Sequence, residues 1–283
     1  MKKLIFISII TLYSVPLLAF TSSSFLISQS AFKNHDYEIS LSNFDLEKVA
    51  ILDDKLLDKI IAAVVTENMY LANELANKLI LKDKNNQEAY IVKLIYLFLN
   101  ERFNEIKKLH NETSNKNELI DFIFFNNNKL KDNLTISKAL IDIVTSSFSN
   151  IDQRSLNYNF LLFYTSLSKI IDQENDKATL IKGELFQNVE QFDIAKKNFE
   201  IIRPSSSFYI DAQKSLAINY SFNSTYDQAV IKIKSILKKN NNNYQIKKIL
   251  GDFYRVKKKY NLAISIYDEM ITENREDLWN ILY

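Results

Sequence analysis

Small side chains recur at a fixed spacing in the last third of the chain. One series lies 34 residues apart, at Gly183, Ala217 and Gly251, and a second keeps the same spacing, at Ala195, Ala229 and Ala263. Aromatic or aliphatic residues recur around both series at intervals of three and four, which place side chains on one face of a helix. The pattern predicts that each 34-residue unit forms two amphipathic helices, joined by short turns at 189–191, 223–225 and 257–259.

The small residues also predict how the helices pack. Paired helices whose axes lie about 8 to 10 Å apart leave little room at their contact, so we expect small residues there and aromatic residues on either side. A single helix pair buries only one of its faces, and pairs must stack to bury the rest. The sequence therefore predicts an all-α solenoid of antiparallel helix pairs.

The repeat resembles the tetratricopeptide-repeat (TPR) family, whose unit carries Leu-Gly or Leu-Ala, an aromatic residue three positions later, then an alanine and a second aromatic residue. The early Trp and closing Pro of the family are missing, and Lys182 stands where Leu is usual. The resemblance implies a right-handed superhelix and a TPR protein of the bacterial exported type. The positions that carry it are Gly183, Phe186, Phe192, Ala195, Phe199, Leu216, Ala217, Tyr220, Tyr226, Ala229, Leu250, Gly251, Tyr254, Tyr260, Ala263 and Tyr267.

The register divides the chain into segments. Residues 171–283 contain three recognisable TPR units, at 176–209, 210–243 and 244–277, followed by the start of a further helix at 278–283. Residues 20–170 show helical spacings without a clear 34-residue register, and we interpret them as degenerate TPR-like helix pairs. Solenoids usually end in a polar cap, whereas residues 278–283 are apolar. We therefore expect the chain to be truncated at its C-terminus, as the N-terminal portion of a longer protein.

Composition supports an all-helical fold. The 283 residues include only 2 Gly and 2 Pro, which sheets and loop-built sites need for hairpins and tight turns. Hydrophobic residues make up 47% of the chain, so it has enough apolar surface to offset the entropy of folding. The absence of Cys excludes disulfides, thiolate metal sites and thiol nucleophiles.

The N-terminus has the order of regions found in secretory signals. Met1-Lys2-Lys3 is basic, residues 4–20 are almost wholly apolar, and Ala19 precedes a polar stretch. We predict a signal peptide at 1–19 and export to the periplasm, or otherwise outside the cytoplasm, of a Gram-negative bacterium. The alternative is a membrane anchor formed by residues 4–20, because about 20 apolar residues span a bilayer. Membrane contact is expected only if this segment stays uncleaved.

The sequence offers no group of residues suited to catalysis. His35 and His110 stand alone, without the convergent partners that metal or acid–base sites need, and we predict that they lie at the surface. With 2 Gly there is no phosphate-binding loop or nucleophile elbow. We expect no enzyme activity, no cofactor and no metal site.

Positive charge gathers in one stretch of the sequence. The net charge is only +2, which does not indicate nucleic acid as a partner. From Lys232 to Lys259, however, ten Lys and Arg residues accompany one acid, Asp252. Such a run is usually a set of solvated helix faces, and the alternative is a site for an anionic ligand.

In the family that the repeat resembles, the first helix of each unit lines a concave groove that holds partner peptides. By register, the groove candidates here are Lys177, Leu180, Glu184, Gln187, Asp211, Lys214, Ile218, Phe222, Gln245, Lys248, Asp252 and Arg255. Phe222 is the expected anchor, because it is apolar where solvent exposure is expected and because aromatic residues tend to dominate interface energy.

The sequence thus predicts a protein–protein interaction scaffold of the bacterial cell envelope, which binds a partner peptide or protein on the concave TPR surface. Two alternatives stay open. The chain could be an N-terminal TPR accessory segment of a longer protein whose functional domain lies beyond residue 283, or a subunit tethered to the membrane by residues 4–20.

Overall fold

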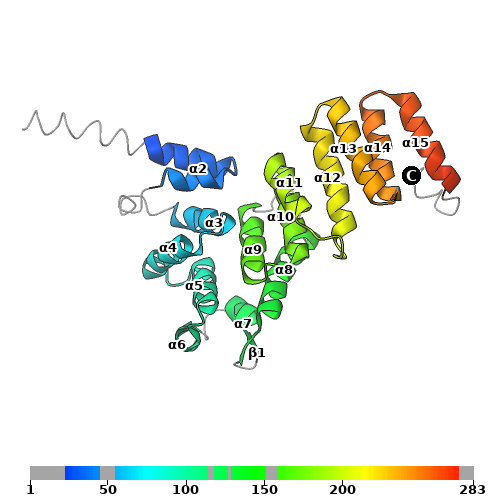
Figure 1. The fold of residues 1–283 in the computed structure, drawn as a ribbon. Helices are drawn as coiled ribbons and strands as arrows, with labels where there is room; N and C mark the ends of the chain where they lie inside the picture. The colour runs from blue at the N-terminus through cyan, green and yellow to red at the C-terminus, as the bar shows by residue number, and fades with distance from the viewer. Residues whose placement is uncertain are drawn as a thin grey trace, which may run out of the picture. The chain divides into compact units, whose positions relative to one another are not determined.

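The computed structural model describes residues 23–44, 55–113, 118–126, 129–150, 158–241 and 243–273. The chain divides into two compact units, Met1–Asn175 and Asp176–Tyr283. The predicted signal segment and the predicted further helix at 278–283 lie outside the described residues. Nearly all of the described backbone is helical, so the prediction of an all-α fold is confirmed (Figure 1). None of the described helices combines the length and apolar composition needed to cross a bilayer.

The first unit opens with a helix over residues 23–33. It continues through α2 (Tyr37–Ser42), α3 (Leu56–Val65), α4 (Met69–Lys82), α5 (Gln87–Leu99), α6 (Phe103–Thr113), α7 (Glu118–Phe124), the short strands β1 (Phe125–Asn126) and β2 (Lys129–Leu130), α8 (Asn133–Asn150) and α9 (Tyr158–Ile171). The two strands are antiparallel, with Phe125 opposite Leu130. Helices that follow each other pack together, as in α3–α4, α4–α5 and α8–α9.

One contact in this unit joins helices that are far apart in the sequence. Helix α9 packs against α3, although five other helices lie between them in the chain. In a regular solenoid each repeat touches only its neighbours. The α3–α9 contact is therefore a departure from simple stacking, and the interpretation of residues 20–170 as degenerate TPR-like pairs stays a prediction.

Asparagine caps the N-terminus of several of these helices. Such caps help a chain with few glycines to form the short connections between helices. The side chains of Asn68 and Asn86 accept hydrogen bonds from the backbone N–H groups of Leu71 and Ala89, at 3.1 and 2.9 Å. Several helices also end in non-glycine residues with left-handed backbone, among them Glu101 with φ 57°. Polar residues therefore begin and end these helices at positions where glycine is often found.

The second unit consists of three helix pairs in its described part. They are α10 (Asp176–Asn188) with α11 (Phe192–Glu200), α12 (Tyr209–Asn223) with α13 (Tyr226–Lys239), and α14 (Tyr244–Val256) with α15 (Tyr260–Glu273) (Figure 1). The second helices begin at Phe192, Tyr226 and Tyr260, which lie 34 residues apart. The predicted turns fall between the two helices of each pair, although the turn at 223–225 begins on the last residue of α12, Asn223. The first helices also contact each other, α10 with α12 and α12 with α14.

Both glycines of the chain lie at the contact within a helix pair. A Cβ atom on Gly183 would lie 2.5 Å from the Phe199 ring, and one on Gly251 would lie 2.6 Å from the Tyr267 ring. At the equivalent positions the middle pair has Ala217 and Ile233, both fully buried. Where alanine replaces glycine on the first helix, isoleucine replaces the aromatic residue on the second. Each contact is thus filled without overlap.

Candidate interaction surface

The predicted groove residues all lie on α10, α12 and α14, the helices that contact each other from one pair to the next. They differ in accessibility. Glu184, Asp211, Phe222, Gln245, Lys248 and Arg255 are exposed, Lys177, Gln187, Lys214, Ile218 and Asp252 are half-buried, and Leu180 is buried. The structure therefore removes Leu180 from the surface, because it faces the packed interior of the unit rather than solvent.

A polar cluster joins the first two pairs. The Ser215 hydroxyl donates to Glu184 Oε1 at 3.4 Å, and Lys214 Nζ lies 3.1 Å from Asp211 Oδ1. The pKa of Glu184 is raised, first because neighbouring atoms displace water around the carboxyl group and then because Asp211 is negative, while Ser215 and Lys214 oppose the shift. Glu184 is exposed to solvent, and the atoms around it still displace part of its hydration water.

A second polar cluster lies within the third pair. Asp252 Oδ1 accepts a hydrogen bond from the Tyr267 hydroxyl at 2.8 Å and lies 3.6 Å from Arg255 Nη2. Tyr267 belongs to the second helix of its pair, so Asp252 is turned partly away from the surface of the first helices. Arg255 and Lys248 remain exposed. Of the predicted charges in this pair, the two cations are therefore the accessible ones.

Phe222 is the most exposed apolar residue of the candidate groove, with 71% of its surface accessible. The ring is restrained because it stacks on Phe192 of the preceding pair, with 6.3 Å between the ring centroids and 12° between the ring planes. Nearby, Asn219 Nδ2 donates to the Phe192 carbonyl oxygen at 2.9 Å and ties α12 to the start of α11. The structure thus restrains an exposed aromatic ring by one contact with a second ring.

The structure divides the basic stretch between Lys232 and Lys259, so it is not one patch. Lys247 is only 3% exposed and is paired with Glu273 at 2.6 Å and Glu269 at 3.7 Å, which withdraws it from any ligand. Lys238 and Lys239 end α13, whereas Lys257 to Lys259 follow the far end of α14. A helix of this length separates its two ends by about 20 Å.

The two histidines differ from the sequence prediction in one case. His35 is half-buried at a turn, with Nδ1 3.1 Å from the Tyr37 hydroxyl, and burial lowers its pKa although Asn159 opposes this. His110 is buried, stacks on Phe125 and lies 2.8 Å from Asp121 Oδ1. The prediction of a surface position is therefore wrong for His110, because α6 turns that side toward β1. The described residues contain no group of three or more His, Asp and Glu that could hold a metal ion.

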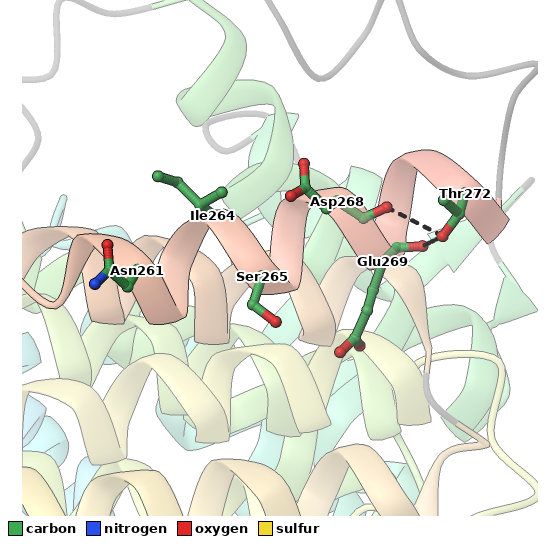
Figure 2. Close-up of a pocket in the computed structure, with 6 residues that line it drawn as sticks. All are labelled: Asn261, Ile264, Ser265, Asp268, Glu269 and Thr272. Carbon is green, nitrogen blue, oxygen red and sulfur yellow. Dashed lines mark hydrogen bonds between the residues drawn. The ribbon is translucent and has the colours of Figure 1, made fainter.

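A shallow hollow lies along the outer side of α15, and sequence reasoning did not single it out. It has a volume of about 480 Å³, and the described residues that line it all belong to this helix: Asn261, Ile264, Ser265, Asp268, Glu269 and Thr272 (Figure 2). The Thr272 hydroxyl donates hydrogen bonds to the carbonyl oxygens of Asp268 and Glu269, and the Glu269 carboxylate pairs with Lys247. The spacing of three and four residues marks one helix face, but a mixed face of this kind resembles ordinary solvated surface in a sequence.

Sequence reasoning also missed a buried lysine in the first unit. Lys59 on α3 is fully buried, and its Nζ donates to Ser28 Oγ at 2.6 Å, Ser40 Oγ at 2.8 Å and the Ser28 carbonyl oxygen at 3.3 Å. It joins α3 to α2 and to the helix at 23–33. A signal was present, since Lys59 interrupts the apolar run of 56–65.

No protein-family model matches this sequence, and comparison with curated proteins finds no significant match. The likeness to TPR proteins therefore rests on the 34-residue spacing and on the residues that fill it, and the site is interpreted from its own geometry.

Proposed function

We propose that this protein is a scaffold that binds a partner protein or peptide along the surface formed by α10, α12 and α14. The observation that carries the proposal is Phe222, an exposed aromatic side chain that is held in place by its stacking on Phe192. An exposed aromatic ring that is already restrained in the free protein contributes strongly to binding, because it loses little conformational entropy when the partner binds.

The charges on the same three helices as Phe222 support a protein ligand. Glu184, Asp211, Lys214, Lys248 and Arg255 place both signs along the three helices. Phe222 lies in the last turn of α12, about 12 to 17 Å along the helix from Lys214 and Asp211. An apolar anchor at the end of a mixed-charge surface still has the apolar and polar parts found in transient protein interfaces. Because the charges nearly cancel, we expect them to select the partner's orientation more than its affinity.

The setting that we propose is the bacterial cell envelope, and the role is binding without catalysis or a cofactor. Export is supported by the basic and apolar order of residues 1–20. A role without catalysis is supported by a chain that has no Cys, two separate histidines and an exposed surface of mixed charge.

A comparison of two single variants tests the proposal. The chain from residue 20 onward, which keeps every described helix, is used to retain partners from an envelope extract. Phe222→Ala should weaken binding of the specific partner by about 30-fold or more, because an anchor side chain typically contributes more than 2 kcal/mol. Ile231→Ala is the matched control, since Ile231 is 68% exposed but lies on α13, a second helix.

The partner should be retained by the control and lost from the Phe222 variant. Equal retention by both variants would contradict the assignment of the anchor. Retention lost with Ile231→Ala and kept with Phe222→Ala would move the binding surface to the second helices.

A further inference from the structure

The turn between α14 and α15 carries an exposed basic and apolar tip. We define the basic turn as Val256, Lys257, Lys258, Lys259 and Tyr260, five consecutive residues. All three lysines are exposed, and so are the two flanking apolar side chains, Val256 at 67% and Tyr260 at 57%. Apolar and cationic groups therefore protrude together at one point of the second unit.

Two of the lysines are held against aromatic rings of the same unit. Lys257 Nζ lies 5.5 Å from the centroid of Phe253, and Lys259 Nζ lies 5.8 Å from the centroid of Tyr226. The neighbouring Arg255 is paired with Asp252. In the described part of the chain, none of the three lysines has a carboxylate oxygen within ion-pairing distance. Asp227, which follows Tyr226, is an exposed acid on the adjacent pair, and this single negative charge leaves the three lysines in excess.

The fold does not require these lysines. Lys258 has left-handed backbone, with φ 58°, and the turn is closed by bonds from the N–H groups of Lys258 and Lys259 to preceding carbonyl oxygens. In the first pair the same conformation is adopted by Glu190, with φ 63° and equivalent bonds. Because the turn accepts an acid as readily as a base, its geometry gives no reason for three consecutive cations.

We propose that the basic turn binds the surface of a membrane that contains anionic lipids. Lysines near such a surface are attracted to phosphate head groups, and tyrosine and valine suit the interfacial region, where an apolar side chain can enter beside the head groups. Acidic peptide motifs are recognised mainly by clusters of Arg, whereas the basic turn contains three Lys and no Arg. Here the apolar side chains of the protein itself protrude. Val256 lies 34 residues after Phe222, at the equivalent position of the next pair, so the basic turn continues the end of the helices that carries Phe222.

Vesicle flotation tests this proposal. Vesicles of phosphatidylcholine alone are compared with vesicles that also contain phosphatidylglycerol, and the chain from residue 20 onward is used so that residues 4–20 do not insert. Wild type should bind the anionic vesicles and release them at high salt. Replacing Lys257, Lys258 and Lys259 by Gln should weaken binding by about 100-fold, since each lysine contributes roughly a fivefold factor.

The matched control replaces Lys234, Lys238 and Lys239 by Gln, which removes the same charge from exposed positions of α13. It should bind nearly as wild type does, and Val256→Ser should weaken binding without changing the net charge. Circular dichroism checks that each variant is folded. Equal weakening by the two triple variants would overturn the proposal in favour of diffuse attraction. Wild-type retention by immobilised polyglutamate, with no binding to anionic vesicles, would overturn it in favour of an acidic protein segment.

Discussion

Lys59 shows how one residue can tie three helices together. Its ammonium group is surrounded by oxygens of Ser28 and Ser40, and it lies 5.7 and 5.6 Å from the ring centroids of Phe32 and Phe44. Burial lowers its pKa from 10.5 to about 8, while the charge of Asp58 acts in the other direction. Three neutral oxygens compensate only part of the lost hydration, so the protonated form is less stable in the folded protein than in the unfolded chain.

The stability of the first unit should therefore rise with pH. The unfolded chain binds more protons than the folded protein between the folded pKa, about 8, and the unfolded value of 10.5. The free energy of unfolding should increase by about 2 kcal/mol from about pH 7.5 to about pH 9.5 and stay level below the lower pKa. Urea unfolding followed by circular dichroism measures it. Lys59→Met should abolish the increase, and an equal slope in that variant would show that another group is responsible.

At the scale of the helix, the contact between Gly183 and Phe199 leaves no room for a Cβ atom on the glycine. The middle pair replaces this combination by Ala217 and Ile233, and both combinations are buried. The two positions therefore act as one packing unit, in which a methyl group on one side requires a smaller side chain on the other.

Gly183→Ala should lower the free energy of unfolding by about 1–3 kcal/mol, because the new methyl group would overlap the Phe199 ring. Phe199→Ile should also destabilise, by leaving a cavity beside the glycine. The double variant should lose less free energy of unfolding than the sum of the two single losses, by about 1 kcal/mol or more. Thermal and urea unfolding of the four proteins form the cycle, and strictly additive effects would show that the two positions do not pack against each other.

The helices of the second unit could be placed from the sequence because each contact there is local. A spacing of 34 residues identifies both helix faces, and the turns at 189–191, 223–225 and 257–259 separate the helices as expected. The inward turn of Leu180 could not be foreseen, since an apolar residue at a groove position can face either way. The burial of Lys247 could not be foreseen either, because it depends on Glu269 and Glu273 reaching back from the next helix.

At the scale of the whole chain, the two units were predictable to different degrees. The boundary at Asn175 and Asp176 lies close to the predicted start of the regular repeats. Within the first unit, the contact of α3 with α9 joins segments that no local pattern relates. The basic stretch shows the converse, because two members of one charge run, Lys239 and Lys257, are separated by the length of α14. Periodicity reports local packing, and long-range contacts need the structure.

Photo-cross-linking tests the central claim, that the first helices of the second unit form the interaction surface, most directly. A photoreactive phenylalanine analogue is placed at position 222 on α12 or at position 231 on α13, and each protein is irradiated with the partner bound. We predict that the partner is cross-linked from position 222 and not from position 231. Cross-linking from position 231 alone, or equally from both positions, would contradict the account.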